Sequence, residues 1–152
     1  MESQLAVAYW VIVVFLGLSV VVMLTGQTMA VVDYDLAVRL GLQESREEVS
    51  EYGVEVNRAF GAGDTVICVP LMAVSLVGLL ARRRWALLTT TAVFGVSAYW
   101  SATILSMLVF LPGAEGYNNQ PGLEIWLFVG FYLVCGVVGL FFMTQRGEAL
   151  LS

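Results

Sequence analysis

The chain has 152 residues, of which 59% are hydrophobic and 12% are charged, and its formal net charge is −5. Soluble domains carry about 25% charged residues, so this composition, with a mean hydropathy of +0.85, excludes an ordinary soluble domain. The sequence contains neither His nor Lys, which removes His-ligated haem, His general bases and Schiff-base lysines. It therefore predicts an integral membrane protein, for which an enzyme is the least favoured class.

Four apolar blocks are long enough to cross a bilayer, since a spanning helix needs about 20 mostly apolar residues. The first block, residues 5–25, has no charge and no preceding Lys or Arg of the kind that begins a signal peptide, so we expect a retained helix. The other blocks are residues 65–81, 85–111 and 123–143. The prediction is an all-α membrane protein with one domain, residues 1–152, folded as an antiparallel four-transmembrane-helix bundle.

The arginines predict how the bundle is oriented, because basic residues in short loops stay on the cytoplasmic side. Arg82, Arg83 and Arg84 fill the turn between the second and third blocks, and Arg146 follows the fourth. The long connector after the first block is acidic instead. We therefore expect a protein of the cell membrane with cytoplasmic N- and C-termini and with both longer connectors outside.

The first outer connector is predicted to form a helical cap over residues 35–60. Ser45 and Glu48 have the spacing of a capping box, and Asp35 is expected to cap a short helix over residues 36–42. An apolar face is predicted from the helical spacing of four residues: Val49, Tyr52, Val56 and Phe60. Two arrangements remain open: a lid on the membrane surface, structural or gating, and a helix that continues straight into the second crossing.

The two cysteines, Cys68 and Cys135, both lie inside apolar blocks. There a small hydrophobic role is expected, and the two lack the paired spacing of metal-binding or redox cysteines. The sequence predicts neither a metal site nor a cofactor.

The carboxylates nearest the membrane are expected at the outer mouth of the bundle. Counting back from Arg82 at 1.5 Å per residue places Asp64 about 27 Å from the inner boundary of a core about 30 Å thick. Glu124 opens the fourth block, where a carboxylate complements a helix N-terminus. Asn57 and Arg58 lie further out and form a polar cluster with Asp64 if the chain bends at residues 61–63. The middle of the membrane is then free of charge.

The third block carries many hydroxyl groups, which favours a central position in the bundle. Its small residues Ala98, Ala102 and Ser106 repeat every four residues and are expected to pack against Gly136, Gly139 or Gly17. A ligand pocket open to the outer side is the functional alternative, with Pro70 bending the second helix toward it. Its predicted lining is Ser97, Tyr99, Trp100 and Thr103, a set that suits a lipid, a quinone or another flat apolar molecule.

Two resemblances to known families follow from short motifs. The residues Gly61-Ala62-Gly63-Asp64 and Tyr34-Asp35 resemble the GxGD and Tyr-Asp elements of intramembrane aspartyl proteases, which implies two carboxylates that share a proton. The stretch Gly78-Leu79-Leu80-Ala81-Arg82-Arg83-Arg84-Trp85-Ala86-Leu87-Leu88, with four crossings and a helical outer connector, resembles small DoxX-like and related four-helix bacterial membrane proteins. That resemblance implies the fold and maps no functional residue.

Three functions therefore remain open. The first is a non-enzymatic interaction or accessory protein, or a binder of a small apolar ligand in the outer half of the bundle. The second is a small oligomeric transporter or channel that uses Asp64, Glu124 and the hydroxyls of the third helix. An intramembrane protease is a remote third. The expected partners are membrane lipids, further copies of the chain or a larger membrane protein, and not nucleic acid.

Overall fold

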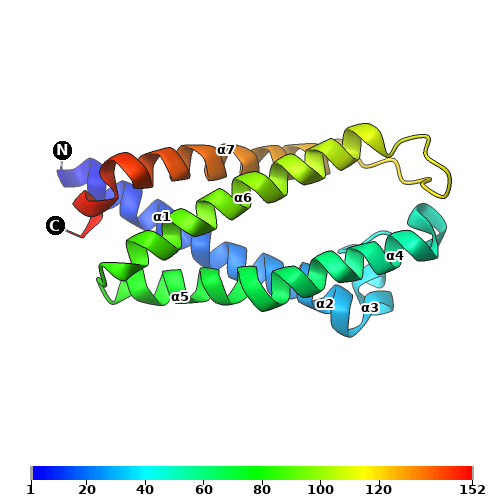
Figure 1. Cartoon of the computed structure of the whole chain (residues 1–152), viewed down its shortest axis with the longest axis horizontal. Coiled ribbons are helices and arrows are strands. Elements are labelled where there is room, and N and C mark those ends of the chain that lie inside the picture. Colours follow the sequence, from blue (N-terminus) through cyan, green and yellow to red (C-terminus); the bar gives the residue numbers. More distant parts are fainter. Residues whose placement is uncertain (1, 152) are drawn as a thin grey trace.

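The computed structural model describes residues 2–151, without the side chain of Glu2, and the elements in this range are helices and turns. Four helical segments are long and apolar enough to cross a membrane: Ser3–Val32, Arg46–Leu80, Trp85–Phe110 and Leu123–Leu150. They run up and down along one axis (Figure 1). The predicted helical membrane protein with four spanning segments agrees with this arrangement.

The first segment contains α1 (Glu2–Met23), the π-helical turn η1 (Leu24–Thr28) and α2 (Met29–Val32). It is followed by α3 (Tyr34–Arg39). The predicted cap residue of this short helix was wrong: Asp33, not Asp35, accepts a hydrogen bond from the Leu36 amide, at 2.9 Å. Asp33 has the extended backbone that an N-cap requires, whereas Asp35 is already inside the first turn.

The second segment contains α4 (Arg46–Gly63), which is interrupted at Ser50, the π-helical turn η2 (Asp64–Cys68) and α5 (Val69–Leu80), with no break between residues 51 and 80. The capping box of Ser45 and Glu48 is confirmed. The cap helix therefore continues into the second crossing. Gly63 has ordinary helical torsions, so the chain does not bend there. Gly61 instead permits a close approach, because a Cβ there would lie 2.7 Å from the Gln27 carbonyl oxygen of η1.

The apolar face predicted for the cap helix was wrong in part. Val49 is buried, but Tyr52 is 81% exposed and Phe60 is also exposed, while Val54 is fully buried. The reason is a break at Ser50, whose φ of 61° and ψ of 171° interrupt the helix. Helical spacing counted through this break assigns the wrong face to the residues that follow it.

The third and fourth segments are α6 (Trp85–Phe110) and α7 (Leu123–Arg146), and the short 3₁₀ turn η3 (Gly147–Leu150) follows. Gly136 brings α7 close to α6, because a Cβ at this position would lie 2.6 Å from the Ala98 nitrogen. This confirms the predicted contact at Ala98. The rest of the small-residue strip is not used in this way, since Ala102 and Ser106 are exposed.

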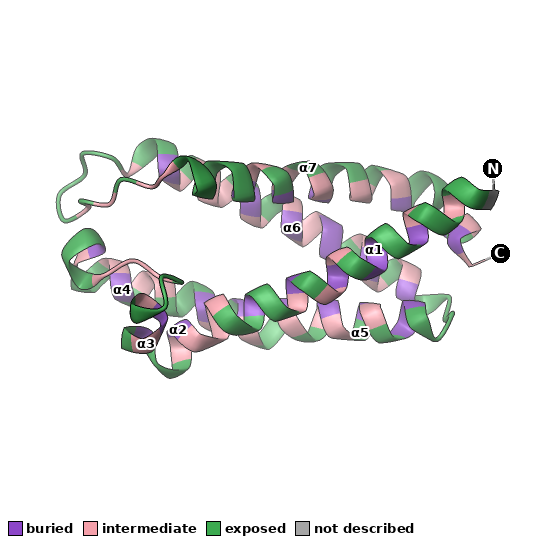
Figure 2. Ribbon diagram, turned by 180° about the vertical axis from the view of Figure 1, so that it is seen from behind, coloured by how far each residue is buried: buried purple, intermediate pink, exposed green. Residues whose placement is uncertain are grey.

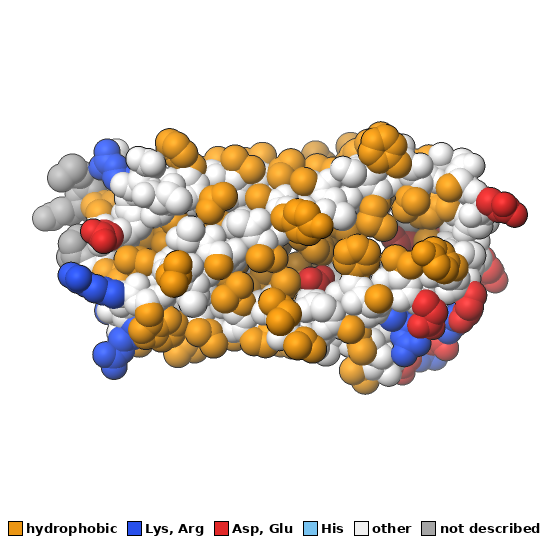
Figure 3. Space-filling model, in the orientation of Figure 1, with side chains coloured by type: hydrophobic (Ala, Val, Ile, Leu, Met, Phe, Trp, Pro, Cys, Tyr) orange, Lys and Arg blue, Asp and Glu red, His pale blue; other side chains and the backbone are white. Residues whose placement is uncertain are grey.

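The two ends of the bundle differ in charge and in structure. Both termini and the turn of Arg82–Arg84 lie together at one end, which we call the arginine end (Figure 1). There the Arg82 guanidinium donates to the Leu150 carbonyl at 3.1 Å and lies 4.3 Å above the Tyr9 ring. The other end carries the cap region, defined as residues 33–60 and 111–122. Charged side chains gather at both ends, and the surface between them is mostly apolar, with one acidic side chain visible in a hollow about midway (Figure 3).

Buried residues form one core along the bundle and a smaller one in the cap region (Figure 2). The main core includes Leu16, Met72, Leu79 and Val93, all nearly inaccessible. The smaller core consists of Ala30, Tyr34, Val49 and Val54. The cap region is thus a packed unit with its own apolar interior, continuous in chain with the first two spanning segments.

Candidate functional site

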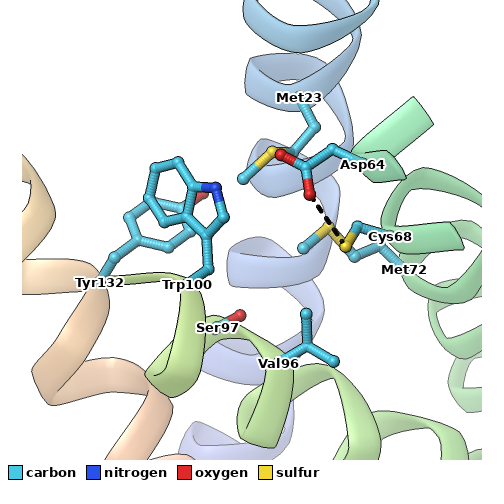
Figure 4. A pocket seen from close by; sticks show the side chains of 8 residues that line it. All are labelled: Met23, Asp64, Cys68, Met72, Val96, Ser97, Trp100 and Tyr132. Atoms are coloured by element: carbon cyan, nitrogen blue, oxygen red, sulfur yellow. Dashed lines mark hydrogen bonds between the residues drawn. The ribbon is translucent and has the colours of Figure 1, made fainter. Parts of the chain in front are cut away.

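A small cavity lies inside the bundle where all four spanning segments meet. Its volume is about 10 Å³, which is close to the smallest space that holds one water molecule. Figure 4 shows the side chains that surround it. They are Met23, Asp64, Cys68, Met72, Val96, Ser97, Trp100 and Tyr132.

Asp64 is the acidic residue of this cavity, and its carboxyl group is only half satisfied. The side chain is 7% exposed. The Cys68 thiol donates to Oδ1 at 3.3 Å, whereas Oδ2 is buried and has no hydrogen bond within 3.5 Å. The Trp100 side chain lies across the cavity and interacts electrostatically with this carboxyl group. Asp64 begins η2, and this turn directs it toward α1 and α6 (Figure 4).

Asp64 does not lie at an open mouth, as the sequence led us to expect. It faces Trp100 of α6 and Tyr132 of α7 across the cavity (Figure 4). At 1.5 Å per residue, Trp100 lies about 15 Å from the last residue of α6, Phe110. The interior of the bundle therefore contains an ionisable group below the end of α6, whereas the expected absence of charge from the middle of the membrane stays a prediction.

The ion pairs of the described residues do not include Asp64. They lie in the cap region, where Arg46 pairs with Asp35 and Glu51 and where Arg58 pairs with Glu55 at 3.0 Å. The predicted approach of Arg58 to Asp64 was wrong, because α4 remains straight where that contact required a bend. An isolated carboxylate is costly to bury, so this site favours either the neutral acid or a bound cation.

The helix α6 adds further polar groups without partners. Buried atoms with no hydrogen-bond partner occur in Thr90, Ser97, Trp100 and Ser101. Thr90, Ser97 and Ser101 lie at helical spacings of seven and four residues, so they share one face of α6. This face is turned toward the bundle, since all three side chains are at most 3% exposed. A row of unsatisfied hydroxyls thus runs past the cavity, with Thr90 toward the arginine end and Ser101 toward the cap region.

Two π-helical turns lie beside the cavity. In η2 the Val69 amide donates to the carbonyl of Asp64, five residues earlier, whereas in an α-helix it would donate to the carbonyl four residues earlier. Pro70 follows immediately, and because it has no amide hydrogen and its ring crowds the carbonyl four residues earlier, it disfavours a regular α-helical turn here. The neighbouring turn η1 contacts η2 through Thr28 and Thr65, whose hydroxyl oxygens are 3.0 Å apart. Such turns often mark functional positions in helices.

The other residues predicted for the site lie elsewhere. Tyr99 is 74% exposed on the outer face of α6, and the Thr103 hydroxyl donates to the Tyr99 carbonyl at 2.9 Å. Glu124 is exposed at the start of α7. Asn57 belongs to the cap region. Of the predicted ligand-binding residues, the structure thus brings together Asp64, Ser97 and Trp100.

Sequence reasoning missed five residues of the cavity: Met23, Cys68, Met72, Val96 and Tyr132. One signal was present for two of them. Asp64, Cys68 and Met72 are each four residues apart, a spacing that places polar and sulfur-containing side chains along one side of a helix. The contributions of α1 and α7 have no comparable signal, because they depend on how the helices pack.

Polar groups in the cap region bond to one another. The Tyr34 hydroxyl donates to the Glu44 carbonyl at 2.9 Å and accepts from Asn57 Nδ2 at 3.1 Å. Asn57 also donates to the Glu44 carboxylate at 2.9 Å. Burial raises the pKa of Tyr34, the nearby Glu44 carboxylate raises it further, and the bond from Asn57 opposes the rise.

The second outer connector also bonds to this unit. The Asn118 and Asn119 amides donate to the Glu48 carbonyl. The break at Ser50 follows two residues later. Because the helix is interrupted there, backbone carbonyls before the break lack some of their partners within the helix and can accept from the connector. The connector between α6 and α7 therefore holds the first turn of α4.

The two aspartates of the protease-like motifs do not form a catalytic pair. Asp35 has a side chain that is 73% exposed and lies 3.4 Å from Arg46, whereas Asp64 is buried inside the bundle. A shared proton requires two carboxyl groups in direct contact. The described chain does not provide this arrangement.

Comparison of the chain with protein-family models, with curated proteins and with solved structures gives no match. The resemblance to DoxX-like proteins remains a prediction.

Proposed function

We propose that this chain is a multi-pass membrane protein that binds a small cation at Asp64 and passes it through the bundle, as a transporter or channel component. The observation that carries the proposal is the buried, unpartnered Oδ2 of Asp64 at a cavity inside the helical bundle. Ionisable groups inside membrane-spanning segments are costly and commonly mark ion pathways.

The unpartnered groups on α6 supply the second part of the argument. A buried polar group without a hydrogen bond lowers the stability of the fold by about 1–3 kcal/mol. Several such groups on one face of a helix are therefore not explained by a role in stabilising the fold. Ser97 lines the Asp64 cavity, and Thr90 lies between this cavity and the arginine end. Their hydroxyls are suited to solvate a small cation or a chain of water molecules that moves between Asp64 and that end.

The size of the cavity disfavours the other leading function, the binding of a lipid or a quinone. Ligand pockets for such molecules are about 300–1,000 Å³, far larger than the 10 Å³ at Asp64. A larger hollow of about 220 Å³ lies between Ala73, Val74, Val77 and Trp85, on the surface of α5 and α6. It offers only apolar surface, as any lipid-facing groove does, and supports no specific ligand.

The experiment is a flux assay with purified protein in lipid vesicles. Proton, Na⁺, K⁺ and Ag⁺ entry are followed with indicators inside the vesicles, for the wild type, Asp64→Asn and the control Glu115→Gln, an exposed carboxylate of the cap region. We expect flux of at least one cation in the wild type and the control, and loss of this flux in Asp64→Asn. Equal flux in all three, or none above protein-free vesicles, contradicts the proposal.

We also propose that the arginine end is cytoplasmic and the cap region extracytoplasmic, in the cell membrane. The support is Arg82–Arg84 in a short turn together with Arg146 near the C-terminus. Cys68 and Cys135 are replaced by Ser, and a single new cysteine is introduced at Arg83 or at Glu47. An impermeant thiol reagent added to intact cells should label Glu47→Cys and leave Arg83→Cys unlabelled. The reverse pattern contradicts this orientation.

A further inference from the structure

The cavity at Asp64 is unusually rich in sulfur. Its lining contains two thioethers, Met23 and Met72, and one thiol, Cys68. These side chains are 4%, 2% and 9% exposed. Figure 4 shows the sulfur-bearing ends of the three residues gathered around the Asp64 carboxyl group. A methionine or a cysteine alone is ordinary core material, but three sulfur groups around an unsatisfied carboxyl oxygen call for another account.

The fold brings these groups together from two segments. Asp64, Cys68 and Met72 come from η2 and α5, where spacings of four residues together with the wide turn of η2 place them along one side. Met23 ends α1, directly before η1. The contact of the two π-helical turns holds Met23 opposite Asp64, so both segments fix the positions of the sulfur atoms.

We propose that this cavity binds one Cu(I) ion through the sulfur atoms of Cys68, Met23 and Met72, with the Asp64 carboxyl group beside it. Thiolate and thioether ligands select soft cations such as Cu(I), whereas Mg²⁺ and Ca²⁺ require several oxygen ligands and Zn²⁺ sites commonly use imidazole. The site has one carboxylate, and the chain has no His. This inference rests on the proposed function and names its cation.

The charges balance without a change in oxidation state. Cu(I) forms a bond to Cys68 Sγ, and the S–H bond breaks. The Asp64 carboxylate, whose Oδ1 already accepts from this thiol at 3.3 Å, takes the proton. A carboxylate and a cation become a neutral carboxylic acid and a neutral copper thiolate, so the charge of the site changes from −1 to zero on binding. If Asp64 starts as the neutral acid, the proton leaves to water instead.

The chain contains matched controls for each sulfur ligand. Cys135 lies on α7 and Met143 lies in the core near the end of α7, and neither lines the cavity. Cys68→Ser is therefore compared with Cys135→Ser, and Met72→Leu with Met143→Leu. Each pair makes the same chemical change, once at the cavity and once elsewhere, so a loss caused only by weaker packing is visible in the control.

The test uses the full-length protein in detergent under reducing conditions. Cu(I) is supplied as a complex with a coloured chelator, and binding is read from the loss of its absorbance, with Ag(I) as a redox-inert second probe. We expect one Cu(I) per chain in the wild type and both controls, and no competition with the chelator in Cys68→Ser. Met72→Leu should bind more weakly. Asp64→Asn should lose about 10–100-fold in affinity, the usual effect of removing the partner of a metal ligand.

Three results would overturn the inference: no Cu(I) binding by folded wild type, equal losses in Cys68→Ser and Cys135→Ser, or tighter binding of Zn²⁺ than of Cu(I). Thermal unfolding of every variant confirms that the protein is folded. The flux assay separates this inference from the proposed function. Proton or Na⁺ flux that depends on Asp64, in a protein that does not bind Cu(I), overturns the copper site and leaves the proposed function standing.

Discussion

The cap region and the bundle interior both contain polar side chains, but those of the cap region are hydrogen-bonded to one another and several of those in the bundle are not. In the cap region Tyr34, Glu44 and Asn57 form a connected set of hydrogen bonds. In the bundle interior Ser97 and Trp100 have buried polar atoms that make no hydrogen bond within 3.5 Å. The bundle interior thus has the poorer hydrogen bonding, although an unpaired polar group lowers stability most where it is shielded from water.

This difference separates groups that hold the fold from groups that are available to a ligand. A polar side chain whose hydrogen bonds are all made contributes to stability and has no free donor or acceptor for an ion. A buried side chain with no partner weakens the fold and can gain a partner when an ion or a water molecule arrives. Substitutions in the two regions should therefore change different measurable properties.

The largest effect on stability is expected where the cap region joins the bundle. Gly61→Ala places a Cβ 2.7 Å from the Gln27 carbonyl oxygen, so α4 and η1 must separate. We expect a loss of about 1–3 kcal/mol, the usual cost of overpacking. Gly63→Ala is the control, because a Cβ there has no neighbour within 4 Å. Thermal unfolding in detergent measures both, and equal stability of the two variants would show that this contact does not hold the helices together.

Asn57→Ala removes two hydrogen bonds of the cap region. We expect a loss of about 1 kcal/mol, because the partners, Tyr34 and the partly exposed Glu44, recover some of their bonding from water. Cation flux and Cu(I) binding should not change, since Asn57 does not line the cavity. A change in Cu(I) affinity without a loss of stability would contradict the division between the two regions.

Alkaline pH should destabilise the cap region through Tyr34. The folded state raises the pKa of this phenol, mainly by burial. Its contribution to stability is therefore complete below the pKa of the unfolded chain, about 10, and is lost as the pH rises through the higher value of the folded state. Unfolding midpoints measured from pH 8 to pH 11 should fall less steeply for Tyr34→Phe than for the wild type. Parallel curves would mean that Tyr34 is not the responsible group.

The smallest effect on stability is expected inside the bundle, at Ser97→Ala. The hydroxyl has no partner, so its removal should leave the unfolding midpoint unchanged or slightly higher. Flux through the bundle should nevertheless decrease, because one of the polar groups around the Asp64 cavity is gone. A clear loss of stability in Ser97→Ala would show that the hydroxyl does make a hydrogen bond, and the contrast with Asn57→Ala would disappear.

Much of the fold follows from the sequence, because it depends on local properties. Apolar block lengths predicted the four spanning segments, and the spacing of Ser45 and Glu48 predicted the capping box. The failures concern geometry that spacing does not encode. The positive φ of Ser50 shifts the buried face of α4, and the straight helix at Gly63 shows that a glycine permits a bend without requiring one.

The candidate site was less predictable than the fold. Asp64 was found from its charge, but its depth was judged from distance along one helix, and that measure does not say which way a side chain faces. Met23 and Tyr132 reach the cavity only because α1 and α7 pack around it. Their residue types are common in any apolar helix, so nothing in the sequence distinguishes them from ordinary core residues.

The wide turn of η2 has a consequence for the angular alignment of the site. In an uninterrupted α-helix, Asp64 and Met72 would be rotated by about 80° from each other around the axis, since each residue advances about 100°. One additional residue in the turn removes about 100° of this advance and brings the two directions to within about 20°. Deleting Val66 or Ile67 would let a regular α-helical turn replace η2 and would keep this alignment, because seven residues at about 100° each also end within about 20° of the starting direction. The turn therefore allows Asp64 and Met72, eight residues apart, to lie along the same sulfur-bearing side of the helix.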